Sequence, residues 1–257
     1  MVTTRVAHVS DEPVFVEVLT DEELSVVARP GPMPVMPFLG DLSQPDAEVA
    51  RRSAYRSLIA RGIVDPPSPE AVAEATARRD GSVELMVRQD VRSAVALREA
   101  AQVVVAIART TSVTQDYWYA HLVDDVVLLE EVSRDGMHRF ALARAAQVGD
   151  LAAAAAVHPD AGDRSGEPVA LTADEGDPTP PDEILERLGA AFVRTDVIVR
   201  RPGDTEPPRF AVFSGPDGTW VVDGATAVAT PVTAEAARAR VGEAVDGIRA
   251  EGVALHG

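Results

Sequence analysis

Cysteine, lysine and asparagine are absent from the sequence, and aromatic residues make up only 4% of it. Without cysteine the chain has no disulfide bond, no thiolate nucleophile and no cysteine ligand for a metal. Without lysine, both Schiff-base catalysis and the phosphate-binding lysine of a P-loop are excluded. Because aromatics are so few, we expect valine, alanine and leucine to fill the hydrophobic core.

Long apolar runs and basic clusters are also missing. No apolar stretch approaches the ~18 residues that a membrane-spanning helix needs. The first residues, MVTTRVAHVSDEPVFVEV, lack the basic start, apolar middle and small-residue cleavage site of a signal peptide. We therefore expect a cytoplasmic protein that does not insert into a membrane. Nucleic acid is not an expected partner, because the formal net charge is −17 and phosphate binding needs a concentrated basic surface.

The N-terminal part of the chain combines strand and helix signals. Valines alternate over residues 13–19, which is typical of a strand with one buried face. Thr20 and Glu23 have the spacing of a capping box, so a helix should begin there. Two further helices are predicted over residues 46–63 and, with Ser68 as N-cap, over residues 68–81.

The next part of the chain has the pattern of a β-meander. Residues 82–144 contain a succession of alternating or continuous apolar runs, and the Asp135–Gly136 pair between two of them is a hairpin signal. We predict about five antiparallel strands over this range. An alanine-rich helix is predicted to follow at residues 147–157.

The second half repeats this order. Residues 158–180 are rich in Gly, Pro and Asp, which is typical of a linker. A helix at 182–192, four short strands up to residue 232 and a closing helix capped by Thr233 are predicted after it. The sequence therefore predicts an α+β fold with a central antiparallel sheet and covering helices. We expect a single domain over 1–257, built from two quasi-repeats, about 1–157 and 181–257, joined by the linker 158–180.

Candidate chemistry centres on two histidines. His121 and His138 face each other if their strands pair, and Asp124 is the nearest acid to His121 in the sequence. Their spacing matches no metal-binding pattern, and the chain contains no G-x-S-x-G or glycine-rich phosphate-binding motif. We therefore predict no metal, no cofactor and no catalytic residue.

A run of three aromatics is the best candidate for a partner-binding surface. On a strand, Tyr117 and Tyr119 share one face and Trp118 takes the other. One of the two faces would be core, and exposed aromatics on the other would mark an interface. We therefore assign partner binding to Tyr117, Trp118, Tyr119 and the nearby Leu122. A sheet that is covered on both faces is the alternative interpretation.

Six stretches that span most of the chain carry a resemblance to a known family: EELSVVARPGPMPVMPFL (22–39), RRSAYRSLIARGIVD (51–65), VELMVRQ (83–89), AQVVVAIA (101–108), FAVFSGPDGTWVV (210–222) and ATPVTAEAARARV (229–241). Taken in this order, they resemble the EspG family, the cytosolic chaperones of actinobacterial type VII (ESX) secretion. The family often has an Asp-Thr and a Gly-Arg-Tyr passage in its late strands, and the segment 209–222 lacks it. The resemblance implies a pseudo-twofold α+β fold that binds the helical tip of PE–PPE or similar heterodimers.

Three functional hypotheses follow from these observations. The first is a non-enzymatic chaperone or adaptor for helical PE–PPE or WXG-like substrates of type VII secretion. The second is a small-molecule-binding or hydrolytic enzyme that uses His121 or His138 with Asp124. The third is a structural homodimer that associates through an exposed sheet. The sequence names neither the client nor the oligomeric state.

Overall fold

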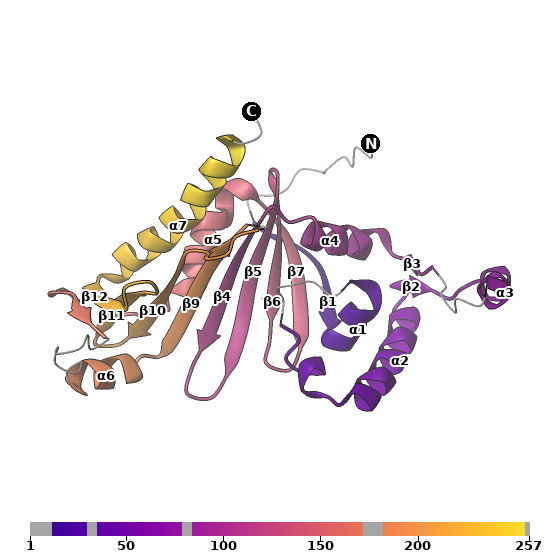
Figure 1. Ribbon diagram of the computed structural model, residues 1–257, viewed down its shortest axis with the longest axis horizontal. Coiled ribbons are helices and arrows are strands. Elements are labelled where there is room, and N and C mark those ends of the chain that lie inside the picture. Colours follow the sequence, from indigo (N-terminus) through magenta and orange to yellow (C-terminus); the bar gives the residue numbers. More distant parts are fainter. Residues whose placement is uncertain (1–11, 30–34, 79–83, 172–181, 202, 255–257) are drawn as a thin grey trace.

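The computed structural model describes residues 12–29, 35–78, 84–171, 182–201 and 203–254, with the side chains of the last helix described as far as residue 247. The chain folds into one long antiparallel sheet with helices on both faces (Figure 1). The predicted α+β class with a central antiparallel sheet is therefore confirmed. No helix in the described ranges has both the length and the apolar character needed to cross a membrane.

The elements before the meander are mostly helical. They are β1 (Val14–Thr20), α1 (Asp21–Val27), the 3₁₀ turn η1 (Leu39–Asp41), α2 (Gln44–Ala60), β2 (Val64–Asp65), α3 (Pro69–Arg78), β3 (Met86–Val87) and α4 (Gln89–Glu99). The capping box at the start of α1 is confirmed, since Glu23 N donates to Thr20 Oγ1 and Thr20 N donates to Glu23 Oε2, both at 3.2 Å. The remaining elements are β4 (Val103–Thr110), β5 (Gln115–Val123), β6 (Val126–Val132), β7 (Met137–Arg144), η2 (Ala145–Gln147), α5 (Val148–Ala156), β8 (Val169–Ala170), α6 (Asp182–Gly189), β9 (Val193–Arg200), β10 (Arg209–Gly215), β11 (Gly218–Asp223), β12 (Val228–Val232) and α7 (Ala234–Ala254).

The strands of the large sheet lie in the order β1-β7-β6-β5-β4-β9-β10-β11-β12-β8. Each half contributes four sequential strands, and the halves meet where β4 pairs with β9. The order of elements is the same on the two sides of this junction, α4-β4-β5-β6-β7-α5 and α6-β9-β10-β11-β12-α7. A twofold relation between the halves stays a prediction.

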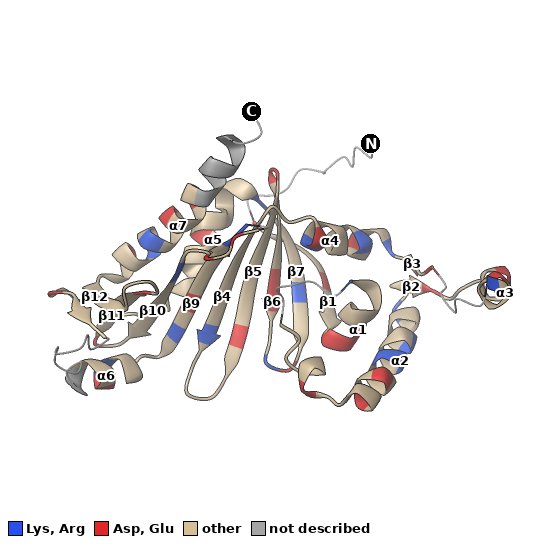
Figure 2. Cartoon of the chain, viewed as in Figure 1, with Lys and Arg blue, Asp and Glu red and all other residues tan. Residues whose placement is uncertain are grey.

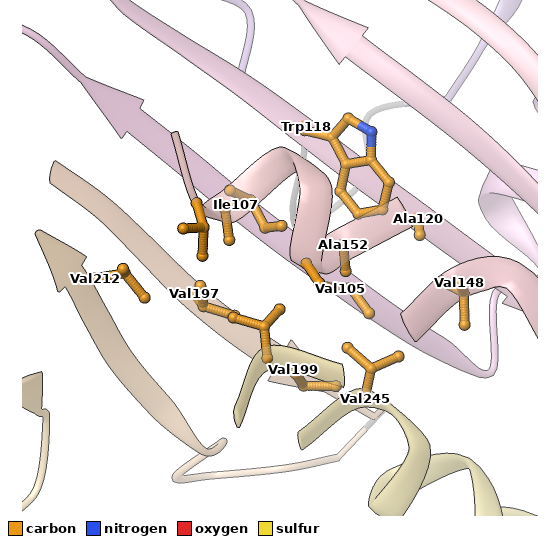
Figure 3. Packing of buried hydrophobic residues seen from close by; sticks show 14 of the residues in the cluster. Val105, Ile107, Trp118, Ala120, Val148, Ala152, Val197, Val199, Val212 and Val245 are labelled. Atoms are coloured by element: carbon orange, nitrogen blue, oxygen red, sulfur yellow. The ribbon is translucent and has the colours of Figure 1, made fainter. Parts of the chain in front are cut away.

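Each face of the sheet has its own hydrophobic core. Helices α5 and α7 lie over one face, called here the α5/α7 face, and their side chains pack with Val105, Ile107, Trp118, Val197 and Val212 (Figure 3). The opposite face, the α4/α6 face, carries two separate clusters. One lies under α1, α2 and α4 in the first half, and the other lies under α6 in the second half.

The segment before β4 differs from the prediction. The described residues 84–88 do not begin the meander, since within them Met86 and Val87 form a strand that pairs with β2 outside the large sheet. Residues 89–99 form α4, a helix that the strand interpretation overlooked. The meander of the first half therefore has four strands, β4 to β7.

The first part of the predicted linker is bound to the second half of the molecule. Residues 158–171 form specific hydrogen bonds with the strands of that half. Gly162 N donates to Gly215 O at 2.9 Å, Thr219 Oγ1 donates to Gly162 O at 2.8 Å, and Arg164 N donates to Val232 O at 3.1 Å. β8 then pairs with β12 at the edge of the sheet. This part of the expected linker is integral to the fold, and residues 172–181 lie outside the described ranges.

Candidate functional site

The aromatic run of β5 lies in the core. Trp118 and Leu122 point to the α5/α7 face, and each side chain is only 4% exposed. Tyr119 points to the α4/α6 face and is also 4% exposed. These three residues are therefore not at a surface that a partner reaches, which corrects the prediction made from the sequence. Only Tyr117 is half-buried, and its ring stacks on Tyr119 with 6.4 Å between the ring centroids.

The sheet register gathers charged side chains inside the first half. His121 of β5, Glu130 of β6 and His138 of β7 share the α4/α6 face, since Glu130 lies two residues along β6 from both Leu128 and Val132, the partners of the two histidines. His121 Nε2 lies 2.8 Å from Glu130 Oε2, and His138 Nδ1 lies 2.7 Å from Glu130 Oε1. One carboxylate thus joins the two histidines.

Two helices complete this group of charges. Asp21, the first residue of α1, places Oδ1 2.6 Å from His138 Nε2, and Arg98 of α4 donates from Nε to Glu130 Oε2 at 3.0 Å. We call Asp21, Arg98, His121, Glu130 and His138 the buried charge cluster. All five residues are buried. Figure 2 shows that charged positions occur within the strands of the sheet as well as on the helices.

The charges of the buried charge cluster stabilise one another. Burial acts to raise the pKa of Glu130, but hydrogen bonds from His121 and His138 and the charge of Arg98 outweigh it and hold this pKa well below its ordinary value. Burial acts to lower the pKa of His138, but its hydrogen bonds to Asp21 and Glu130 raise this pKa above its ordinary value. Glu130 is therefore ionised at neutral pH, and the protonated form of His138 is favoured relative to that of an ordinary histidine.

The enzymatic hypothesis is only partly matched by this geometry. The strands of His121 and His138 do not pair, because β6 lies between them; the two histidines are joined through Glu130, and His138 also contacts Asp21. Asp124 lies in the turn between β5 and β6, with φ of 51°, and accepts a hydrogen bond from the side chain of Gln102. The sequence interpretation missed Glu130, although its place between Leu128 and Val132 in an alternating strand indicated an inward side chain.

The polar atoms of the buried charge cluster are bonded mainly to one another, which leaves few of them to contact a substrate. Its carboxylate oxygens and most of its ring nitrogens are paired within the cluster or with backbone amides. Within the described residues no set of His, Asp and Glu side chains is arranged to hold a metal ion. The arrangement fits a buried ion-pair network that ties α1 and α4 to the sheet.

A different surface remains open at the middle of the sheet. On the α5/α7 face, alternate residues of β4 and β9 such as Val105 and Val199 are buried. The residues between them, on the α4/α6 face, are only half-buried. We call this surface the open strip; it consists of Val104, Ala106 and Ala108 of β4 with Asp196, Ile198 and Arg200 of β9.

The sides of the open strip are charged and aromatic. Arg194 of β9 pairs with Asp196 at 2.8 Å, and its guanidinium lies 5.8 Å from the ring centroid of Phe213. Tyr117 borders the strip on β5, opposite Ala108. The strip thus combines small apolar side chains with an aromatic and charged border.

Comparison of the sequence with protein-family models and with curated proteins finds no match.

Proposed function

We propose that this protein is a non-enzymatic cytoplasmic chaperone or adaptor that binds helical substrates of type VII secretion, of the PE–PPE or WXG-like kind. The observation that carries the proposal is the open strip, where one face of the central strands is half-buried although the other is fully packed. The resemblance of the sequence to the EspG family supports the same role.

The chemistry of the open strip suits an apolar helical client. Ala106 and Ala108 are small, so the backbone of a helix can approach the strands closely, and Ile198 and Tyr117 supply apolar contact area. Arg200 and the Arg194–Asp196 pair give the border charges that fix orientation. The acidic remainder of the molecule, with a net charge of −17, would keep such a complex in solution.

The proposal is tested by titrating the purified chain with PE–PPE and WXG-type proteins encoded in the same genome. We expect a stable complex with at least one of them, and at least about a tenfold weaker affinity for Ala106→Glu, since this change places a charge in the apolar strip. Ala154→Glu is the matched control, because Ala154 is exposed on α5, on the other face of the sheet. Absence of a complex with every candidate, or equal weakening by both variants, would overturn the proposal.

The alternative function is a small-molecule-binding or hydrolytic enzyme. The pairing of acids and imidazoles in the buried charge cluster is the observation in its favour, and their burial away from solvent argues against it. A thermal-shift screen with metal ions and metabolites separates the two functions. Strong stabilisation by one small ligand, lost in His121→Gln, would favour the enzyme.

A further inference from the structure

His138 is held between two carboxylates, and this geometry determines how many protons the three groups must share. An ionised carboxylate can only accept hydrogen bonds. Asp21 Oδ1 lies 2.6 Å from Nε2 of the ring, and Glu130 Oε1 lies 2.7 Å from Nδ1. A neutral imidazole has one N–H, so one of the two contacts would then set lone pair against lone pair. The Asp21–His138–Glu130 chain therefore requires one proton more than neutral histidine supplies.

The other groups around the ring make the cluster neutral when this proton is present. Arg98 from α4 and protonated His138 balance the charges of Asp21 and Glu130. His121 from β5 contacts Glu130 through Nε2, and its Nδ1 has no partner among the described residues. The ring of Tyr119 of β5 stacks on His121, and the ring of Phe140 of β7 stacks on His138.

The two carboxylates that contact His138 are fixed in the structure in different ways. Glu130 is on β6, the ladder neighbour of β7, and it keeps Arg98 and His121 as donors without His138. Asp21 begins α1 at the outer edge of the sheet and is bound to the turn before β7 through Asp21 N, which donates to Gly136 O at 2.8 Å. Because Glu130 is fixed within the ladder and Asp21 follows the edge strand β1, we expect loss of the proton to displace Asp21.

Asp21 also holds a second segment. Its Oδ2 accepts from Phe38 N at 2.8 Å and from Leu39 N at 2.9 Å, at the start of η1. We call residues 35–42 the strap. Val35 N also contacts Tyr119 Oη at 3.5 Å, so the strap lies against the aromatic side of β5 that borders the open strip.

We propose that the proton shared by Asp21, His138 and Glu130 is a latch, and that its loss releases the strap and the start of α1 from the sheet while the rest of the fold stays intact. Removal of the proton leaves a buried carboxylate facing a ring lone pair, and the cheapest relief is movement of Asp21 toward water. The strap moves with it because the Phe38 and Leu39 amides both donate to the same carboxylate oxygen of Asp21. This inference rests on the first half of the molecule and does not depend on the proposed function.

Amide hydrogen exchange of the whole wild-type chain, followed from pH 6 to 9, tests the latch. Protection factors, which correct for intrinsic exchange, should be lower for the Phe38 and Leu39 amides than for the central Val105 amide, since the strap opens locally. They should fall by up to about tenfold per pH unit above the ordinary histidine value of 6.5, as one-proton linkage requires. Equal protection of the strap and Val105, or pH-independent protection of the strap, would overturn the latch.

Asp21→Asn gives an independent test, with Asp46→Asn as the matched control. Asp46 is also in the first turn of a helix, but it is exposed and pairs only with Ser43. We expect Asp21→Asn to lower the protection of Phe38 and Leu39 at pH 6 and to flatten its pH dependence, and Asp46→Asn to leave both as in wild type. An unchanged pH profile in Asp21→Asn would contradict the latch; if this variant does not fold, the wild-type profile decides alone.

Discussion

At the scale of single residues, Glu130 determines how the elements of the first half of the molecule are arranged. It is a fully buried carboxylate in a core made mainly of valine, alanine and leucine, and it accepts hydrogen bonds from Arg98, His121 and His138. A buried charge of this kind adds little stability when it is paired, but it is costly when a partner is removed. The cluster therefore favours one arrangement of α1, α4 and the sheet over others.

Arg98→Leu should destabilise the protein by about 3 kcal/mol, because it removes the guanidinium that balances a buried carboxylate. Arg52→Leu is the control, because Arg52 pairs with Glu48 on the exposed side of α2, and its loss should cost less than about 1 kcal/mol. Chemical unfolding of both variants measures the difference. Equal midpoints for the two would show that Arg98 does not stabilise the cluster.

The pH dependence of stability has opposite signs for the two central groups. Glu130 has a lowered pKa, so its contribution is complete above its ordinary value of 4.5 and is lost as the pH falls through the lowered pKa. His138 has a raised pKa, so its contribution is complete below 6.5 and is lost as the pH rises through the raised pKa. The free energy of unfolding should therefore be greatest between about pH 4.5 and 6.5. Urea unfolding followed from this range up to about pH 9, repeated with His138→Gln, should show the alkaline decrease only in the wild type.

At the scale of elements, the sequence predicts those segments whose local pattern and tertiary role agree. The strands β9 to β12, the capping box of α1 and the helices α2 and α7 follow from alternation, caps and helical periodicity. Residues 82–99 were misjudged because an alternating run precedes a helix of weak amphipathicity. Val91, Ala94 and Arg98 are its buried residues, at helical spacing, but a buried arginine is not expected on an apolar face.

The candidate site was less predictable than the fold, for a physical reason. Which face of β5 is covered depends on where α5 lies, and no local pattern in Tyr117–Trp118–Tyr119 contains that information. The placement of His121 and His138 on either side of Glu130 follows from strand register, but Asp21 reaches His138 from an element 117 residues away. Nonlocal contacts of this kind decide the site, whereas mostly local signals decide the elements.

Ala152→Leu in α5 tests the close packing of the small-residue helix on the sheet. Ala152 is fully buried in the cluster that contains Trp118 and Val105, so added methylenes should force the helix away and cost about 1–3 kcal/mol. Ala154→Leu is on the exposed side of the same helix and should change stability by less than about 0.5 kcal/mol. Thermal unfolding compares the two, and equal stability would mean that α5 is loosely packed.

At the scale of the whole molecule, the two halves are in contact at three places. β4 pairs with β9 along seven residue pairs, α5 packs with α7, and the segment 158–171, which follows the first half in sequence, is bound to the second. The core on the α5/α7 face also runs across the junction, since Val105 and Val197 belong to the same cluster. We therefore expect the chain to unfold as one cooperative unit.

The two tryptophans make this expectation measurable, because Trp118 is buried in the first half and Trp220 in the second. The variants Trp118→Phe and Trp220→Phe each leave one fluorescent reporter, and far-ultraviolet circular dichroism reports the whole chain of the same sample. In each variant, fluorescence and circular dichroism should give the same denaturant midpoint and slope, as two-state unfolding requires. Each comparison is made within one variant, so any destabilisation by the substitution itself cancels. If fluorescence in one variant changes at lower denaturant than circular dichroism, that half unfolds separately, and the chain would then consist of two domains joined at β4 and β9.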